Sequence, residues 1–173
     1  MKNICLIGLF LTFFACAPIR VNYDFDREVN FSNYKTYNYF SDMNTGLTEL
    51  DTKRFLEALD GKLATLGITF SETPDFYIDI TSRTVQSTQQ SSIGFGVGGT
   101  GSNVGGGISM GIPVGQSNLN RQLTIEFVDK INKQLFWQAI SESSYKENKT
   151  PQVREDEIKQ LVNKILAAYP PKK

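Results

Sequence analysis

Two stretches of alternating apolar and polar residues lie close together in the second half of this 173-residue chain, between Arg121 and Tyr145, with a polar turn at 129–133. The alternating apolar positions are Leu123, Ile125 and Phe127 in the first stretch and Leu135, Trp137 and Ala139 in the second. Because side chains of a strand point to opposite faces in turn, this pattern predicts an antiparallel hairpin with its apolar face toward a core. Trp137, the only Trp of the chain, is expected to be a structural anchor of that core.

Further strands are expected on the N-terminal side of this hairpin, at residues 19–25, within 31–40, at 68–71 and at 76–86. In the second of these, Tyr37 and Tyr39 share one face. We expect a half-buried surface whose hydroxyl groups reach water, and a ligand platform is the alternative. In the last strand, Phe76, Ile78 and Ile80 are predicted to share the buried face.

An amphipathic helix is predicted between the second and third strands, over residues 50–67. Asp51 is the expected N-cap and Gly67 the C-terminal stop. Gly61 interrupts the helix interior and should weaken it by about 1 kcal/mol relative to Ala. Its apolar stripe consists of Phe55, Leu56, Leu59, Leu63 and Leu66.

A second helix follows the hairpin. Thr150 is its predicted cap, Pro151 fits the first helical position, and the sequence Tyr169–Pro171 ends it. Glu155 to Glu157 are expected to complement the positive end of the helix dipole. The buried stripe is predicted at Ile158, Leu161, Val162 and Ile165. Together the elements predict one α+β domain over residues 16–173, a mostly antiparallel sheet with two helices packed on one face and a Gly-rich excursion.

The first fifteen residues have the features of a secretory signal: Lys2, an apolar run from Ile4 to Phe14, and the small residue Ala15. The run is too short to anchor the chain across a bilayer by itself. Cys16, directly after the cleavage position, resembles the lipobox of bacterial lipoproteins. That resemblance implies removal of residues 1–15 and lipid attachment at Cys16. A plain signal peptide followed by an unrelated Cys is the alternative.

Composition excludes several kinds of chemistry. The chain has no His, which rules out a His base, a Ser-His-Asp triad and a His-ligated metal. Its two Cys residues, Cys5 and Cys16, lie at the N-terminus, so the body has no disulfide, thiolate nucleophile or Cys metal site. Lys and Arg (18) balance Asp and Glu (18), which argues against a nucleic-acid partner. We expect no cofactor and no metal.

Glycine dominates residues 91–117, between two predicted strands. Gly96, Gly98 and Gly101 have the spacing of a dinucleotide-binding motif, but no helical pattern follows them, so we reject nucleotide binding. Apolar residues alternate with small ones at Ile93, Phe95, Val97, Ile108, Met110, Ile112 and Val114, which form a possible interaction segment. Three interpretations remain: a mobile excursion at the sheet edge, a docking surface for another chain, or a membrane-inserting hairpin of an oligomeric pore.

Carboxylate pairs give little support for an enzyme. Asp24 and Asp26 share a strand face, as a hydrolytic or metal-binding pair would, but no third acidic residue completes a site. Glu126 and Asp129 are separated between strand and turn. We therefore expect exposed carboxylates and no catalysis.

The chain resembles the bacterial lipoproteins grouped as domain of unknown function 4136. Four features carry the resemblance: Cys16, the early segment VNYDFDREVNFSNYKTYNYF, the strand entry TPDFYIDI and the hairpin LTIEFVDKINKQLFWQA. The family pattern has an Asp at the hairpin turn and a Trp in the return strand, here Asp129 and Trp137. The resemblance implies an α+β domain on a lipid anchor and no established activity.

These observations predict a lipid-anchored cell-envelope protein with a structural or protein-interaction role. Ala17 is not acidic and residues 17–21 lack an acidic cluster, which favours the periplasmic face of the outer membrane. The expected partners are the membrane, through the N-terminal lipid, and another envelope protein. A small-ligand or lipid-binding auxiliary of an envelope transport system is the alternative, and an apolar pocket larger than about 300 Å³ would favour it.

Overall fold

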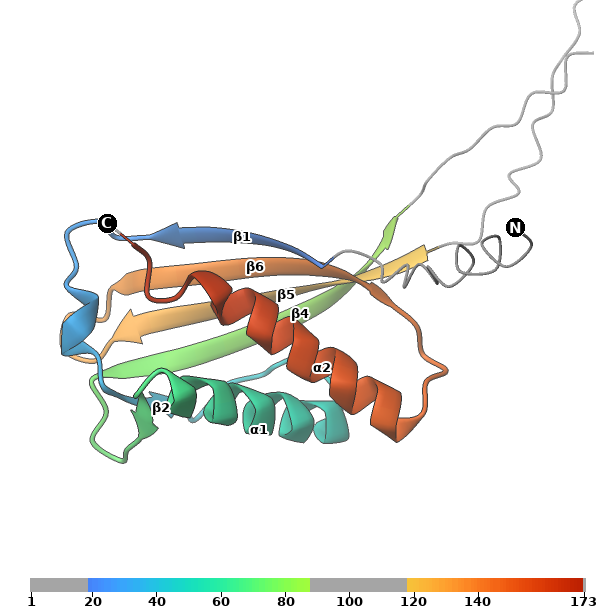
Figure 1. Cartoon of the computed structure of the whole chain (residues 1–173), viewed down its shortest axis with the longest axis horizontal. Coiled ribbons are helices and arrows are strands. Elements are labelled where there is room, and N and C mark those ends of the chain that lie inside the picture. Colours follow the sequence, from blue (N-terminus) through green and yellow to red (C-terminus); the bar gives the residue numbers. More distant parts are fainter. Residues whose placement is uncertain (1–18, 88–117, 173) are drawn as a thin grey trace, which may run out of the picture.

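A six-stranded sheet, covered on one face by two helices, forms the body of the protein in the computed structural model, which describes residues 19–87 and 118–172 (Figure 1). The strands are β1 (Arg20–Phe25), β2 (Thr36–Tyr39), β3 (Thr69–Phe70), β4 (Phe76–Ser87), β5 (Asn118–Asp129) and β6 (Leu135–Tyr145). The helices are α1 (Glu49–Thr65) and α2 (Pro151–Ile165), with short 3₁₀ turns at Phe31–Asn33 and Leu166–Ala168. The strand order is β1-β6-β5-β4-β2-β3. The α+β class is confirmed.

The sheet is mixed, so the prediction of a mostly antiparallel sheet was wrong. β1, β6, β5 and β4 pair antiparallel, whereas β2 pairs parallel with both β3 and β4. The reason is the position of α1, which follows β2 and precedes β3 and β4. A helix that crosses over between strands returns the chain to the starting end of the sheet, so the next strand runs parallel.

The hairpin of β5 and β6 has a bulge that the alternation did not predict. Phe127 pairs with Trp137 and Val128 with Leu135, which leaves Phe136 as the extra residue. A bulge places two consecutive side chains on the same side. Phe136 and Trp137 are therefore both buried, at 2% and 1% exposure, while Leu135 is 46% exposed. The prediction that Leu135 faces the core was wrong.

The N-cap of the first helix lies three residues before the expected one. Thr48 is the N-cap, and its side chain accepts a hydrogen bond from the Asp51 N–H at 3.3 Å. Asp51 lies in the first turn with its carboxylate directed inward, so its prediction as the cap was wrong. At the other end, Gly67 has a φ of +76°, the left-handed conformation expected after a helix.

The second helix begins as the sequence predicts. Thr150 accepts from the Val153 N–H at 3.4 Å, and Pro151 occupies the first position. The expected role of Glu155 to Glu157 was wrong, because the first turn of α2 carries no acidic residue. Instead, the Glu155 carboxylate accepts from Lys159 at 2.7 Å, one turn further along the helix.

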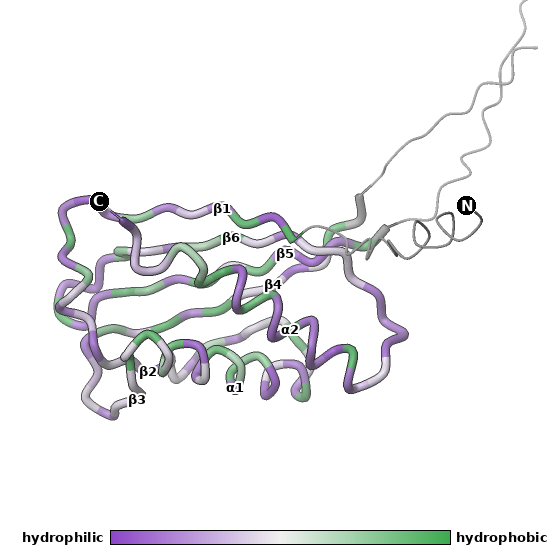
Figure 2. The backbone as a smooth tube through the Cα atoms, in the orientation of Figure 1, coloured by the Kyte–Doolittle hydropathy of each residue, from purple (hydrophilic) through white to green (hydrophobic). Residues whose placement is uncertain are grey.

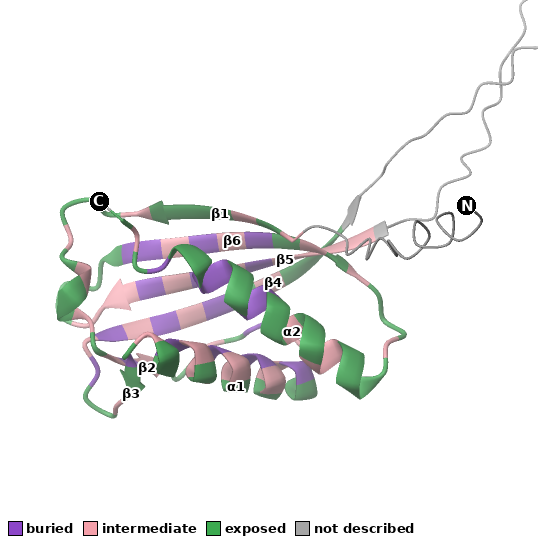
Figure 3. Cartoon of the chain, viewed as in Figure 1, coloured by how far each residue is buried: buried purple, intermediate pink, exposed green. Residues whose placement is uncertain are grey.

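The core fills the space between the sheet and the two helices. Figure 3 shows buried residues alternating with less buried ones along the central strands, and Figure 2 shows the matching alternation in hydropathy. Aromatic rings dominate the end near the Leu166–Ala168 turn, where Phe127 lies 4.5 Å from Trp137 and 5.1 Å from Tyr169, centroid to centroid. The predicted shared face of β4 is confirmed, since Phe76, Ile78 and Ile80 are fully buried.

Residues 1–15, Cys16 and the Gly-rich residues 91–117 lie outside the described part of the chain, as do the positions Ile93, Phe95, Val97, Ile108, Met110, Ile112 and Val114. The leader, the lipidation site and the interaction segment therefore stay predictions. None of the helices within 19–87 and 118–172 is long and apolar enough to cross a membrane.

Candidate functional site

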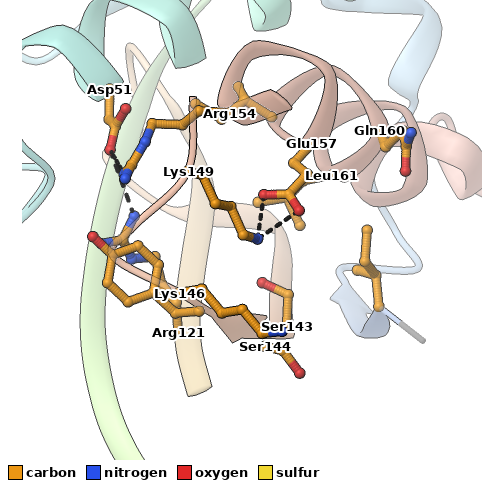
Figure 4. Close-up of a pocket in the computed structure, with 13 residues that line it drawn as sticks. Asp51, Arg121, Ser143, Ser144, Lys146, Lys149, Arg154, Glu157, Gln160 and Leu161 are labelled. Atoms are coloured by element: carbon orange, nitrogen blue, oxygen red, sulfur yellow. Dashed lines mark hydrogen bonds and ion pairs between the residues drawn. The ribbon is translucent and has the colours of Figure 1, made fainter. Parts of the chain in front are cut away.

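A pocket of about 330 Å³ opens between α2 and the end of β6 (Figure 4). Its polar side chains include Asp51 from α1, Arg121 from β5, Tyr145 from β6, Lys149 from the following loop, and Arg154 and Glu157 from α2. Ile19, Ile158 and Leu161 supply apolar lining. The pocket therefore combines a charged wall with an apolar one.

The charged wall is built around the Asp51 carboxylate, whose side chain is 2% exposed. Its Oδ1 accepts from Arg54 Nη1 at 3.0 Å, and its Oδ2 accepts from Arg154 Nη1 at 2.8 Å. A third guanidinium, that of Arg121, lies 4.0 Å from Oδ2. The dehydrated carboxylate is stabilised only because several cations surround it.

Tyr145 lies under two of these cations. The Cζ atom of Arg121 is 3.6 Å from the ring centroid, and that of Arg154 is 5.9 Å away. The hydrogen bond with Arg154, together with the charge of Arg121, lowers the pKa of the Tyr145 hydroxyl. The same hydrogen bond, followed by that with Asp51, raises the pKa of Arg154. The lowered pKa of Tyr145 indicates a positive potential at its hydroxyl, whereas the raised pKa of Arg154 shows that Tyr145 and Asp51 stabilise its charge.

The loop before α2 adds a further ion pair. Lys149 Nζ donates to both oxygens of Glu157, at 2.5 and 2.6 Å, and Figure 4 shows this pair reaching across the pocket. Arg154 Nη2 also donates to the Glu147 carbonyl at 2.7 Å, which ties the loop to the helix. Counted over the lining, four basic residues (Arg121, Lys146, Lys149, Arg154) face two acidic ones (Asp51, Glu157), a net charge of +2.

The pocket lies at the end of the sheet where β1 begins and where β4 ends and β5 begins. Arg20 pairs with Glu142, Leu119 with Tyr145, and Ser87 with Asn118, so all these residues share one end of the sheet (Figure 1). Ile19, the first described residue, lines the pocket itself. Ile19, Ser87 and Asn118, the residues at which the described ranges begin or end, therefore lie at the end of the sheet that carries the pocket.

Residues 21–171 match the family described as Domain of unknown function (DUF4136). The chain belongs to this family. The match covers nearly all of the predicted domain and agrees with the resemblance seen in the hairpin and in the early aromatic segment. No curated protein sequence matches this DUF4136 chain.

Solved structures similar to this DUF4136 domain share its fold at low sequence identity. A PDZ domain protein from Parabacteroides distasonis matches 91% of the chain with a TM-score of 0.56 and 17% identity, and the chain spans 36% of that protein chain. A PelC dodecamer from Paraburkholderia phytofirmans matches 90% of this chain and 100% of its own, with a TM-score of 0.53 and 9% identity. A variant of that PelC dodecamer gives 0.51 at 10% identity, over 87% and 95% of the two chains.

The carboxylates singled out in the sequence do not come together in the DUF4136 domain. Asp24 accepts from the N–H of Phe25 at 2.9 Å, and Asp26 accepts from the N–H of Glu28 at 2.8 Å, both on the surface. Glu126 accepts from the Gln138 amide at 2.5 Å. Within the described ranges, no three of His, Cys, Asp and Glu gather as a metal site would require.

The two expected structural anchors occupy the positions where packing and turn geometry need them. Trp137 is 1% exposed in the core. Asp129 holds the hairpin turn, because its carboxylate accepts from the N–H of Asn132 at 2.6 Å, the N–H of Ile131 at 2.8 Å and the Tyr34 hydroxyl at 2.9 Å. Burial alone would raise the pKa of Asp129, but these hydrogen bonds outweigh it and lower the pKa.

Tyr37 and Tyr39 were expected to share a half-buried face, but Tyr37 is only 2% exposed, whereas Tyr39 is half-buried. Both hydroxyls donate to the same oxygen, Oδ1 of Asp60 on α1, at 2.5 Å. Burial first, and the Asp60 hydrogen bond second, raise the pKa of both tyrosines. The pair joins the sheet to α1 and is a structural contact.

Sequence reasoning missed the pocket, although one signal was present. Arg121 stands at an inward position of β5, in the same alternation as Leu123 and Ile125. A charged residue on an inward face needs a buried counter-ion or a ligand. The counter-ion, Asp51, is far away in sequence and was interpreted as a helix cap.

Proposed function

We propose that this DUF4136 domain is a non-catalytic component of the bacterial cell envelope, held at the outer membrane by lipid on Cys16 and acting by contact with other envelope molecules. The observation that carries the proposal is that Ile19, Ser87 and Asn118 lie at the same end of the sheet as the charged pocket. A lipid at Cys16 would bring this end close to the membrane.

The side chains at the pocket support contact rather than catalysis. Asp51 forms ion pairs with arginines and Glu157 forms one with Lys149, while the Tyr145 ring lies against guanidinium groups. These side chains already have charged partners within the domain. PelC has a similar fold and forms a dodecamer, so association of this chain with itself is one form that the contact can take.

A small-ligand or lipid-binding role is the second candidate, and the pocket is the observation that favours it. A volume of about 330 Å³ is at the lower end of the range for ligand sites. The lining is mixed, with apolar residues on one side and four basic residues on the other, so a purely apolar ligand would leave the charged wall unmatched.

The anchor is tested by metabolic labelling with a fatty acid in cells that express the intact chain, Cys16→Ser or Cys5→Ser. Cys5 lies within the leader, so Cys5→Ser is a matched control. The expected result is label in the intact chain and in Cys5→Ser, and none in Cys16→Ser. Equal label in the intact chain and in Cys16→Ser would exclude the anchor.

Contact with partners is tested by a pull-down from detergent-solubilised membranes. The intact chain is compared with a chain in which residues 91–117 are deleted and with one in which the same 27 residues are scrambled. We expect the deletion and the scrambled segment to lose partners that the intact chain retains. Identical partners in all three samples would remove the Gly-rich segment from the contact surface.

A further inference from the structure

The charged wall of the pocket contains more positive charge than its own carboxylates can neutralise. The side chains of Arg121, Lys149 and Arg154 are 16%, 17% and 19% exposed, so water reaches each of them only in part. The Asp51 carboxylate lies within 4.0 Å of three guanidinium groups, and Glu157 forms an ion pair with Lys149. Partly dehydrated like charges repel one another, and an anion placed among them would relieve that repulsion.

The donor groups on this wall suit a phosphate. Two planar guanidinium groups, those of Arg121 and Arg154, lie over the same tyrosine ring, and such forks match the oxygens of a phosphate. Ser143, which pairs with Arg121 across β5 and β6, and Ser144 also line the pocket, and Lys146 adds an ammonium group. Arg154 and Arg121 lower the pKa of Tyr145, which agrees with a positive potential at this wall.

The apolar wall and the position of the pocket indicate what carries the phosphate. Ile19, Ile158 and Leu161 would be covered by a short apolar chain attached to the anion. Ile19 follows Cys16 by three residues, so at most about 10 Å of extended chain separates it from the proposed anchor. A lipid on Cys16 would therefore hold the pocket near the phosphate layer of the bilayer.

We propose that the pocket between α2 and β6 binds the phosphate of an anionic phospholipid, with Arg121 and Arg154 on the phosphate and Ile19, Ile158 and Leu161 against the first part of an acyl chain. The membrane source of the ligand rests on the proposed function. Binding of the phosphate and its apolar chain does not, because the pocket exists in the domain whether or not Cys16 carries lipid.

The test is calorimetric titration of the purified full-length protein in a non-ionic detergent. The probes are a short-chain phosphatidylglycerol, a phosphatidylcholine with the same acyl chains, and inorganic phosphate. We expect phosphatidylglycerol to bind at least ten times more tightly than either of the others. Equal affinity for phosphatidylcholine would overturn the requirement for an anion, and equal affinity for inorganic phosphate would overturn the requirement for an apolar chain.

Variants at matched positions show whether the pocket is the site. Arg121→Gln should weaken phosphatidylglycerol binding about tenfold, and Arg121→Lys, which keeps the charge but loses the fork, should fall between. Arg83→Gln is the control, because it removes the same charge near the same end of β4 and β5, where Arg83 is exposed and its Nε donates to Gln122 at 2.6 Å. Equal weakening by Arg83→Gln, or unchanged binding in Arg121→Gln, would overturn the proposal. Thermal unfolding of each variant shows that it is folded.

Discussion

The substitution Asp51→Asn should destabilise the protein more than any exposed carboxylate change. The amide would keep the size of the side chain and remove the charge that holds Arg54 at 3.0 Å and Arg154 at 2.8 Å. Breaking a buried ion pair by removing one partner costs about 3–5 kcal/mol, because the remaining charge is left without a counter-ion. The two arginine side chains are 21% and 19% exposed, so water recovers part of this cost. We expect a loss of about 3 kcal/mol.

Urea unfolding at pH 7 measures this loss without added salt, which would screen the charges. For a slope of about 2 kcal/mol per molar urea, the midpoint should fall by about 1.5 M. Asp156→Asn, an exposed carboxylate change on α2, is the control and should stay within about 0.5 kcal/mol of the parent protein.

A double-mutant cycle separates the ion pair from other effects of the substitution. Arg154→Gln removes one partner of Asp51, so the double variant should be more stable than the sum of the two single losses implies, by at least about 1 kcal/mol. Additive losses, or a cost below about 1 kcal/mol for Asp51→Asn alone, would refute the view that this carboxylate organises the cluster.

Three further predictions follow from positions elsewhere in the fold. Phe136→Ala should cost about 3–5 kcal/mol and Leu135→Ser less than about 0.5 kcal/mol in urea unfolding, and the reverse order would contradict the bulge. Gly46→Ala should destabilise by more than about 2 kcal/mol, because Gly46 has a φ of +65° and a Cβ would collide with the Ser82 carbonyl. Gly61→Ala, in open space within α1, should instead stabilise by about 0.5–1 kcal/mol. Similar thermal midpoints for the two variants would refute this. Asp129→Asn should destabilise the protein at pH 7 and have little effect near pH 2. The lowered pKa of the Asp129 carboxyl gives stability that is present above its unfolded-state pKa of about 3.9 and is lost as the pH falls through its folded-state pKa. A difference in urea midpoint that does not change with pH would disprove this.

Local patterns in the sequence predicted most of the elements, because each element carries its own period and boundary residues. The end of α1 at Gly67 and the start of α2 at Thr150 and Pro151 depend on neighbours within one turn, so they could be found from the sequence alone. The direction of β2 could not, since alternation is the same in parallel and antiparallel strands. The bulge at Phe136 could not be predicted for a similar reason. Either Phe136 or Trp137 can be taken to continue the alternation from Leu135 until the register with β5 is known.

The pocket depends on contacts between residues far apart in the chain. Asp51 meets Arg121 and Arg154 only after α1 and α2 have packed on the same face of the sheet. Nothing local to Asp51 distinguishes a buried counter-ion from a helix cap, because Asp is favoured in both positions. The inward position of Arg121 was the one local indication that a buried charge needed a partner.

The edge position of β1 determines the order in which the sheet can be completed. Among the described strands β1 pairs only with β6, so Val21 pairs with Ser141, 120 residues further along the chain. Until residues 135–145 have reached it, β1 has no partner among the described strands. Contacts between such distant residues slow folding, since the long intervening segment must be closed first. The pair of β1 and β6 joins the most distant segments of all the described strand pairs, so we expect it to form late in folding.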